Sequence, residues 1–269
     1  MRRLFTATTL SLLAMAGGAR AQDATRDFCA DRPGKGSPPC VLDVGRFQAE
    51  LGVADGAWSR GGGTSTVDTA FGDLELRLGL TPTVEGQVSW TAHERIRDED
   101  RTSGAVSTVS GAGDLNLGLR WSLKNPGGDG VSIALQPFVT APVGSDGIGD
   151  GAWQGGLIAP MSLPLNADWS LALSPEVDAR ADGDGSGRHL GYAASVGVGR
   201  SIGPFGLGVE LSADRDEDPS GHVTEASFDL TAAWTPKAVS DLQLDASAYV
   251  GLNHYTPDLE LAFGVAKRF

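Results

Sequence analysis

The sequence predicts an all-β protein, an antiparallel transmembrane β-barrel of about 12 strands with both termini on the periplasmic side. Short segments alternate apolar residues with small or polar ones, the period of a strand that has one apolar face. Turn residues, among them many of the 38 glycines, separate these segments. The last segment, 258–269, alternates up to the final residue. In a soluble sheet such a strand would be an exposed edge, whereas in a closed barrel it pairs with the first strand. A soluble periplasmic or secreted β-sandwich is the alternative, and the regular strands argue against it.

The N-terminus has the pattern of an export signal. Met1 to Arg3 is positively charged, Leu4 to Ala16 is apolar, and Ala19-Arg20-Ala21 is a cleavage motif. This pattern predicts a signal peptide over 1–21, because the apolar run is too short to span a membrane. Removing its three arginines leaves 18 basic and 34 acidic residues, a net charge of −16. Nucleic acid is therefore excluded as an expected partner.

Cys29 and Cys40 are the only cysteines, and export would carry them to an oxidising compartment. We expect them to form one disulfide, since metal binding would need further ligands nearby. No metal or cofactor is expected. The residues between the cysteines are turn formers. We expect 22–42 to be a periplasmic tail that carries this disulfide, and the alternative is a small plug folded into the barrel mouth. The barrel itself is expected over 43–269.

The strands follow in order, each bounded by turn residues. In 70–81, for example, Leu74, Leu76, Leu78 and Leu80 face one way. The segment 153–163 is the least regular, because Pro160 within it and Pro164 directly after it each remove a hydrogen-bond donor from the ladder. The twelve expected strands span about 45–54, 70–81, 84–93, 113–123, 131–140, 153–163, 169–178, 190–199, 205–212, 227–234, 241–250 and 258–269.

An even strand number suits a single-chain bacterial barrel with periplasmic termini. The connections after the odd strands would then be exterior, and most of them are longer and more charged than the others, as barrels of this class require. These expected exterior loops are 55–68, 94–110, 143–151, 181–188, 214–222 and 253–257.

Aromatic residues on the apolar face form two expected girdles. The inner girdle comprises Trp121, Trp169, Phe205, Trp234 and Phe269, and the outer girdle comprises Trp90, Trp153 and Tyr192.

The opposite face would line the lumen with glycine, alanine, serine and a few charged residues. Twelve strands should leave at most a narrow path, since eight-stranded barrels are filled by their side chains. Acids outnumber the two arginines, which favours cations or polar solutes. The alternative is that these groups only satisfy one another and lumen water, and so seal the barrel. The candidate path residues are Glu50, Glu75, Arg77, Glu85, Arg120, Glu176, Glu210, Asp229 and Asp245.

The chain ends on Phe269, and this ending resembles that of bacterial outer-membrane β-barrel proteins. The resemblance implies recognition of Phe269 by the barrel-assembly machinery. It also implies outer-membrane lipid as the surroundings of the protein and the cell outer membrane as its location.

Four stretches carry a more specific resemblance: 31–34 (DRPG), 45–50 (GRFQAE, after Cys40), 113–120 (GDLNLGLR) and 142–144 (PVG). They are similar to the outer-membrane family named after the MetA pathway of phenol degradation, whose members are often described as transporters. The resemblance implies a channel or transporter for small solutes, including aromatic or other small organic compounds. The expected inward apolar groups are few: Phe138, Ile158 and Tyr249.

Catalysis is not expected. His93, His189, His222 and His254 fall at outer strand ends or in loops, and no HExxH or Walker motif occurs. The run Asp182-Gly-Asp184-Gly-Ser186-Gly resembles a calcium loop but places Ala193 where an EF-hand needs a bidentate glutamate. We therefore expect a non-enzymatic, porin-like conduit that works by passive diffusion. The alternative is a sealed structural or adhesive barrel that acts through its exterior loops.

Overall fold

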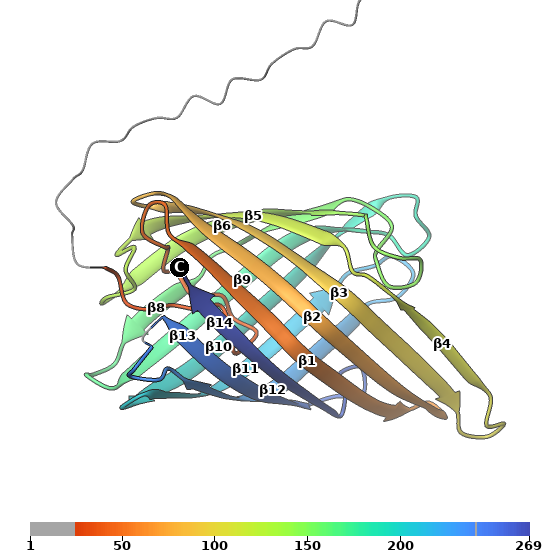
Figure 1. Ribbon diagram of the computed structural model, residues 1–269. Helices are drawn as coiled ribbons and strands as arrows, with labels where there is room; N and C mark the ends of the chain where they lie inside the picture. The colour runs from red at the N-terminus through yellow and green to blue at the C-terminus, as the bar shows by residue number, and fades with distance from the viewer. Residues whose placement is uncertain (1–24, 240) are drawn as a thin grey trace, which may run out of the picture.

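The computed structural model describes residues 25–239 and 241–269, so the expected signal peptide over 1–21 lies outside the described residues. Within them no helix with the length and apolarity of a membrane span occurs. The described chain is built from strands (Figure 1). Their bounds are β1 Phe47–Gly61, β2 Thr64–Thr81, β3 Val84–Asp100, β4 Val106–Gly111, β5 Leu115–Lys124, β6 Ser132–Ala141, β7 Gln154–Ile158, β8 Met161–Pro164, β9 Trp169–Ala181, β10 Arg188–Ile202, β11 Phe205–Asp216, β12 Val223–Trp234, β13 Leu242–Gly251 and β14 Leu259–Arg268.

The strands close into a barrel. β1 pairs antiparallel with both β2 and β14, which removes the edge that the last strand would otherwise expose. β7 and β8 both lie between β6 and β9 and share one position in the wall, while β4 pairs only with β3. Twelve positions therefore make up the closed wall, which confirms the predicted strand number and the antiparallel barrel.

The sixth wall position is broken at Ala159 and Pro160, where the sequence is least regular. Pro160 has no amide hydrogen, so the ladder cannot continue through it. Its carbonyl still accepts a hydrogen bond of 2.9 Å from the Ala134 amide, and the Ala159 amide donates to the Pro175 carbonyl at 2.9 Å. The break therefore leaves the neighbouring strands connected.

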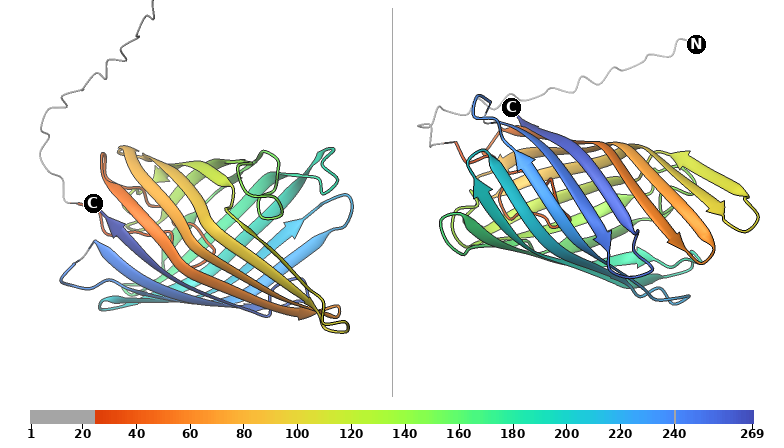
Figure 2. Two further views of the ribbon diagram at one scale, coloured as in Figure 1. Left: turned by 45° about the vertical axis from the view of Figure 1, so that its right-hand side comes forward. Right: turned by 90° about the horizontal axis from the view of Figure 1, so that it is seen from below.

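Two exterior connections were expected as loops over 55–68 and 94–110, and this expectation is wrong. β1 and β2 continue to a tight turn at Gly62 and Gly63, whose φ angles are 55° and 87°. β3 runs to Asp100 and pairs with β4, so this hairpin extends beyond the wall (Figure 2). These extensions show no sustained apolar alternation, because polar residues occupy most positions on both of their faces. Cross-strand polar contacts support them instead, as between Thr66 and Asp98 at 2.6 Å.

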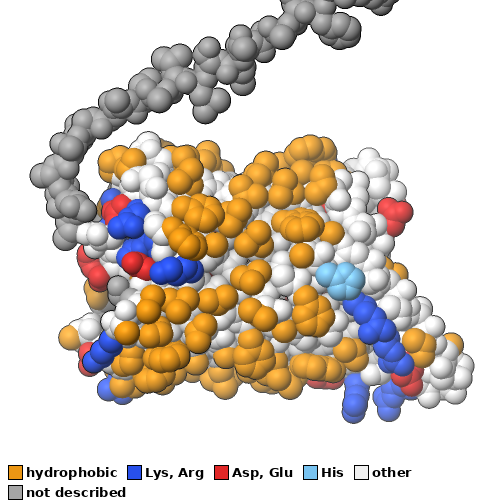
Figure 3. Space-filling model, viewed as in Figure 1, with side chains coloured by type: hydrophobic (Ala, Val, Ile, Leu, Met, Phe, Trp, Pro, Cys, Tyr) orange, Lys and Arg blue, Asp and Glu red, His pale blue; other side chains and the backbone are white. Residues whose placement is uncertain are grey.

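The outer surface of the wall is apolar, with a broad hydrophobic band (Figure 3). Aromatic pairs mark its periplasmic end: the Phe205 and Trp234 rings lie 6.4 Å apart, and the Phe47 and Phe269 rings 5.9 Å apart. The side chains of all eight residues expected in the two girdles are exposed on this surface. In a barrel of this kind, such exposed aromatic side chains contact lipid rather than water.

The chain before β1, residues 25–46, lies inside the periplasmic half of the barrel, and we call it the N-terminal segment (Figure 2). Cys40, Val41 and Leu42 are only 2 to 3 % exposed. The structure therefore differs from the expected peripheral tail and matches the alternative of a segment folded into the barrel mouth. The segment forms no strand, so its backbone amides need other partners, and carboxylates on the wall supply them.

Candidate functional site

The candidate site is the lumen where the N-terminal segment meets the barrel wall. All nine predicted path residues are placed on the inner side of the wall. Glu75, Glu176 and Glu210 border open space beside the segment or contact it. The remaining six are almost fully buried: Glu50, Arg77, Glu85, Arg120, Asp229 and Asp245.

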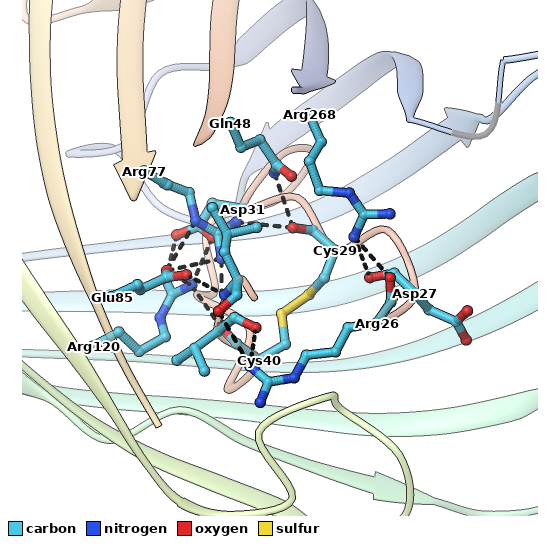
Figure 4. The surroundings of a disulfide bond; sticks show 12 residues. Arg26, Asp27, Cys29, Asp31, Cys40, Gln48, Arg77, Glu85, Arg120 and Arg268 are labelled. Carbon is cyan, nitrogen blue, oxygen red and sulfur yellow. Dashed lines mark hydrogen bonds and ion pairs between the residues drawn. A yellow bond between two sulfur atoms is a disulfide. The ribbon is translucent and has the colours of Figure 1, made fainter. Parts of the chain in front are cut away.

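Four of these residues join Asp31 of the N-terminal segment in an ionic cluster (Figure 4). Its members are Asp31, Glu50, Arg77, Glu85 and Arg120, supplied by the segment and by β1, β2, β3 and β5. Arg77 Nη1 lies 2.8 Å from Asp31 Oδ1 and 3.0 Å from Glu50 Oε1, and its Nη2 lies 2.8 Å from Glu85 Oε1. Arg120 pairs with Asp31 and, at 3.1 Å, with Glu85. Each arginine thus bridges the segment and the wall.

The cluster pairs three carboxylates with two guanidiniums, so each buried charge has an oppositely charged partner. The side chains of Arg77, Arg120 and Glu85 are 0 % exposed, where an unpaired charge would be very unfavourable. Burial raises the pKa of the Asp31 carboxyl, but the Arg120 and Arg77 guanidiniums outweigh this effect and hold that pKa below its ordinary value. Asp31 is therefore a carboxylate at neutral pH, as the two arginines require.

The predicted disulfide between Cys29 and Cys40 is present beside this cluster (Figure 4). The Cys29 carbonyl accepts hydrogen bonds from Arg77 Nη1 and from Gln48 Nε2, both at 2.9 Å. The Cys40 carbonyl accepts one from Arg120 Nη1 at 3.3 Å. The same two arginines that bind Asp31 thus also fix both ends of the disulfide loop.

The tip of the N-terminal segment crosses the lumen to the opposite wall. Arg32 Nε lies 3.2 Å from Asp245 Oδ1, and the Arg32 carbonyl accepts a hydrogen bond of 2.8 Å from Gln243 Nε2. The Lys35 amide donates to Glu210 Oε1 at 2.9 Å. Two more of the predicted path residues, Asp245 on β13 and Glu210 on β11, therefore hold the segment.

Two cavities lie beside the tip of the segment. The smaller, of about 270 Å³, is lined by hydroxyls and acids together with Lys35. The larger, of about 360 Å³, is lined by Glu75 and other polar residues, with Phe138 and Ile158 as apolar members. Glu176 on β9 borders both cavities. Carboxyl, hydroxyl and small apolar side chains thus line the space beside the segment tip.

Among the described residues, two groups of acidic and histidine side chains have oxygen or nitrogen atoms within 4.8 Å of one another, as metal ligands would. One is Asp31, Glu50 and Glu75, in which the first two already pair with arginine. The other is Asp182, His189 and Asp218 at the outer end of the barrel. There His189 Nδ1 lies 2.9 Å from Asp182 and its Nε2 lies 2.9 Å from Asp216, so carboxylates face both ring nitrogens. Apart from Glu75, the members of both groups already form ion pairs with described residues.

Sequence reasoning missed Asp31 and Gln48 as members of the site. Both lie in stretches that carry the family resemblance, 31–34 and 45–50, and this was the one signal that pointed to them. Their partners could not be deduced from strand alternation, because the N-terminal segment has no strand period.

Comparison with solved structures places the fold among outer-membrane barrels. The COG4313 outer membrane channel from Pseudomonas putida F1 superposes with a TM-score of 0.66 at 18 % identity, covering 88 % of this chain and 99 % of that one. The β domain of the Bordetella autotransporter BrkA superposes with a TM-score of 0.51 at 12 % identity, covering 84 % of this chain and 100 % of that one. No curated protein matches the sequence.

These likenesses, the closed twelve-position wall and the apolar outer band identify a barrel of the bacterial outer membrane. A family profile with the description "Putative MetA-pathway of phenol degradation" matches residues 30–269, which include most of the N-terminal segment and the whole wall. The chain belongs to this family.

Proposed function

We propose that the protein is a conduit through which small solutes cross the outer membrane by passive diffusion, along a narrow acidic path beside the N-terminal segment. The observation that carries this proposal is the position of Glu176. Its side chain borders both cavities beside the segment tip and forms no ion pair with a described residue. In its ionised form, an acidic side chain at that position favours cations or polar solutes over anions.

The remaining path residues would act in two ways. Glu75, Glu176 and Glu210 border or face the open part of the lumen, where they would contact solute. The ionic cluster, Asp245 and Asp229 would instead shape the path by holding the segment or the wall. Small organic compounds, aromatic ones included, fit the proposal because Phe138 and Ile158 give the larger cavity an apolar side.

A sealed barrel that acts through its exterior loops is the second candidate function. The ionic cluster favours it, because five interlocked charged residues and the disulfide loop occupy the periplasmic half of the lumen. The two candidates differ in one measurable property, the passage of solute.

The export and assembly steps are further proposals. Residues 1–21 would be removed on export, and the assembly machinery would recognise the end of β14. The Phe269 amide donates to the Phe47 carbonyl at 2.8 Å and the Phe269 side chain is 60 % exposed, so the residue both closes the barrel and faces outward.

Liposome swelling with the refolded mature protein tests the proposed function. Swelling should be fast with small polar solutes and slow as solute size increases, because the cavities are only about 270 and 360 Å³. A small aromatic alcohol should enter at a rate comparable to that of a polar solute of equal size. Rates equal to those of protein-free liposomes for every solute would contradict the conduit and support the sealed barrel.

A further inference from the structure

The outer ends of β1, β2 and β3 carry positive charge on the outside of the barrel. Phe71 on β2 is 48 % exposed on the lipid-facing surface, and His93 on β3 lies directly opposite it. The side chains of two residues paired across neighbouring strands project from the same face of the sheet, and successive side chains along one strand project from opposite faces. The pairs Thr69 with Arg95 and Val67 with Arg97 therefore share the outer face.

The same reasoning extends to β1. Trp58 is paired with Val67, and Arg60 with Ser65, so both project outward as well. Arg60, Arg95 and Arg97 thus form one basic surface, which we call the arginine patch. Figure 3 shows basic side chains gathered on this side of the molecule, beyond the hydrophobic band.

The inner face of these strand ends carries the opposite charge. Asp68, Glu94 and Asp98 occupy the alternate positions, opposite Ile96, Ala70 and Thr66 respectively. Apart from Glu99, which is paired with Ser65 on the outer face, these strand ends are thus divided by face, with cations outside and acids inside. Mixed charges on both faces would suffice for solubility, so the division indicates that the two faces meet different surroundings.

The height of the patch agrees with the polar boundary of the outer leaflet. Trp58, Phe71 and Trp90 are exposed aromatic residues of the kind that lie at the membrane interface. Arg95 follows His93 by two residues, about 7 Å along the strand at about 3.3 Å per residue. Because barrel strands are tilted, the arginines lie a few ångströms above the aromatic residues, at headgroup level.

The charges of the patch are available to a ligand. Among the described residues, neither Arg60 nor Arg95 forms an ion pair. Arg97 lies 2.8 Å from Glu99, but the two side chains are 35 % and 41 % exposed, and such surface pairs contribute little. In contrast, Arg180 on the inner face is held by Asp178 and Asp214.

We propose that the arginine patch binds the phosphate groups of lipopolysaccharide, the anionic glycolipid of the outer leaflet. Guanidinium groups bind phosphate oxygens through paired, charge-assisted hydrogen bonds. The aromatic residues below the patch would contact the acyl chains of the same molecule. The site is a fixed lipid contact of the barrel, independent of the path for solute.

Binding of purified lipopolysaccharide to the detergent-solubilised mature protein tests this proposal. The triple variant R60Q/R95Q/R97Q should bind about 100-fold more weakly than the wild type, and each single variant about fivefold more weakly, as expected for charges near an anionic lipid. The double variant R200Q/K267Q is the matched control, since both residues lie over aromatic rings at the periplasmic end. Its affinity should be unchanged. The single variants also provide the test if the triple variant does not fold.

Two comparisons define the ligand. Removing the phosphates of the glycolipid should abolish the difference between wild type and triple variant, and millimolar inorganic phosphate should not displace the intact lipid. Equal affinity of wild type and triple variant would overturn the proposal. Displacement by inorganic phosphate would overturn it too, since the patch would then be a general anion site.

Discussion

Arg120 Nη1 donates a hydrogen bond of 2.9 Å to Asp31 Oδ1, although the two residues lie 89 positions apart in sequence. This contact joins the N-terminal segment to β5. Together with Arg77 it makes the segment part of the lumen rather than an appendage of the barrel. The width and charge of any path through the protein therefore depend on residues both of the wall and of the segment.

Replacing Arg77 should destabilise the protein strongly. R77Q leaves Glu50 and Glu85 buried with one fewer positive partner, and breaking a buried pair in this way costs about 3–5 kcal/mol. Denaturant unfolding in detergent measures the loss. R200Q is the control, because Arg200 lies at the surface over the Trp169 ring and should contribute about 1 kcal/mol or less. Equal decreases in the free energy of unfolding of R77Q and R200Q would show that the ionic cluster does not stabilise the protein as described.

Replacing Asp31 should loosen the segment and spare the wall. D31N removes the carboxylate shared by the two arginines, so hydrogen exchange of the amides in 25–46 should become faster by about one order of magnitude or more, the effect of losing a charged hydrogen bond. Exchange within β9 to β12 should not change. The control D27N alters an exposed residue of the same segment. Unchanged protection of these amides from exchange in D31N would show that contacts other than those of Asp31 hold the segment in the lumen.

The same contact predicts a pH dependence. The pKa of Asp31 is lower in the folded protein than in the unfolded chain, so its contribution is fully present above the ordinary aspartate pKa of about 3.9 and is lost as pH falls below that value. The difference in segment protection between wild type and D31N should therefore be constant from pH 7 to about pH 5 and shrink only at lower pH. A difference that disappears already near pH 6 would contradict this assignment.

Removing the disulfide should release the loop between its ends. The double variant C29S/C40S loses a constraint on a loop of 11-residue separation, for which about 2–3 kcal/mol is typical. The twelve-position wall should persist in circular dichroism, whereas a spin label at Ser37 should become more mobile. Equal mobility with and without the disulfide would mean that the ionic cluster alone fixes the segment.

The wall could be predicted from the sequence because lipid on one side and a polar lumen on the other impose strict alternation. The strand number, the girdle residues and the inward direction of all nine path residues follow from this parity. The ends of β1 to β3 were missed because Val67 is the single apolar residue between Ser65 and Thr69, so no alternation marks them. The place of the N-terminal segment could not be deduced, since the contacts of Asp31 and Lys35 join distant parts of the chain and have no period.

The reversal potential of single channels in a planar bilayer under a salt gradient tests the central claim most directly. The wild type should give discrete conducting events with cation preference. E176Q should lower that preference, whereas D129N, which alters an exposed acid in the turn between β5 and β6, should not. Silence of the intact protein, or a reversal potential that E176Q leaves unchanged, would contradict an acidic path beside the N-terminal segment.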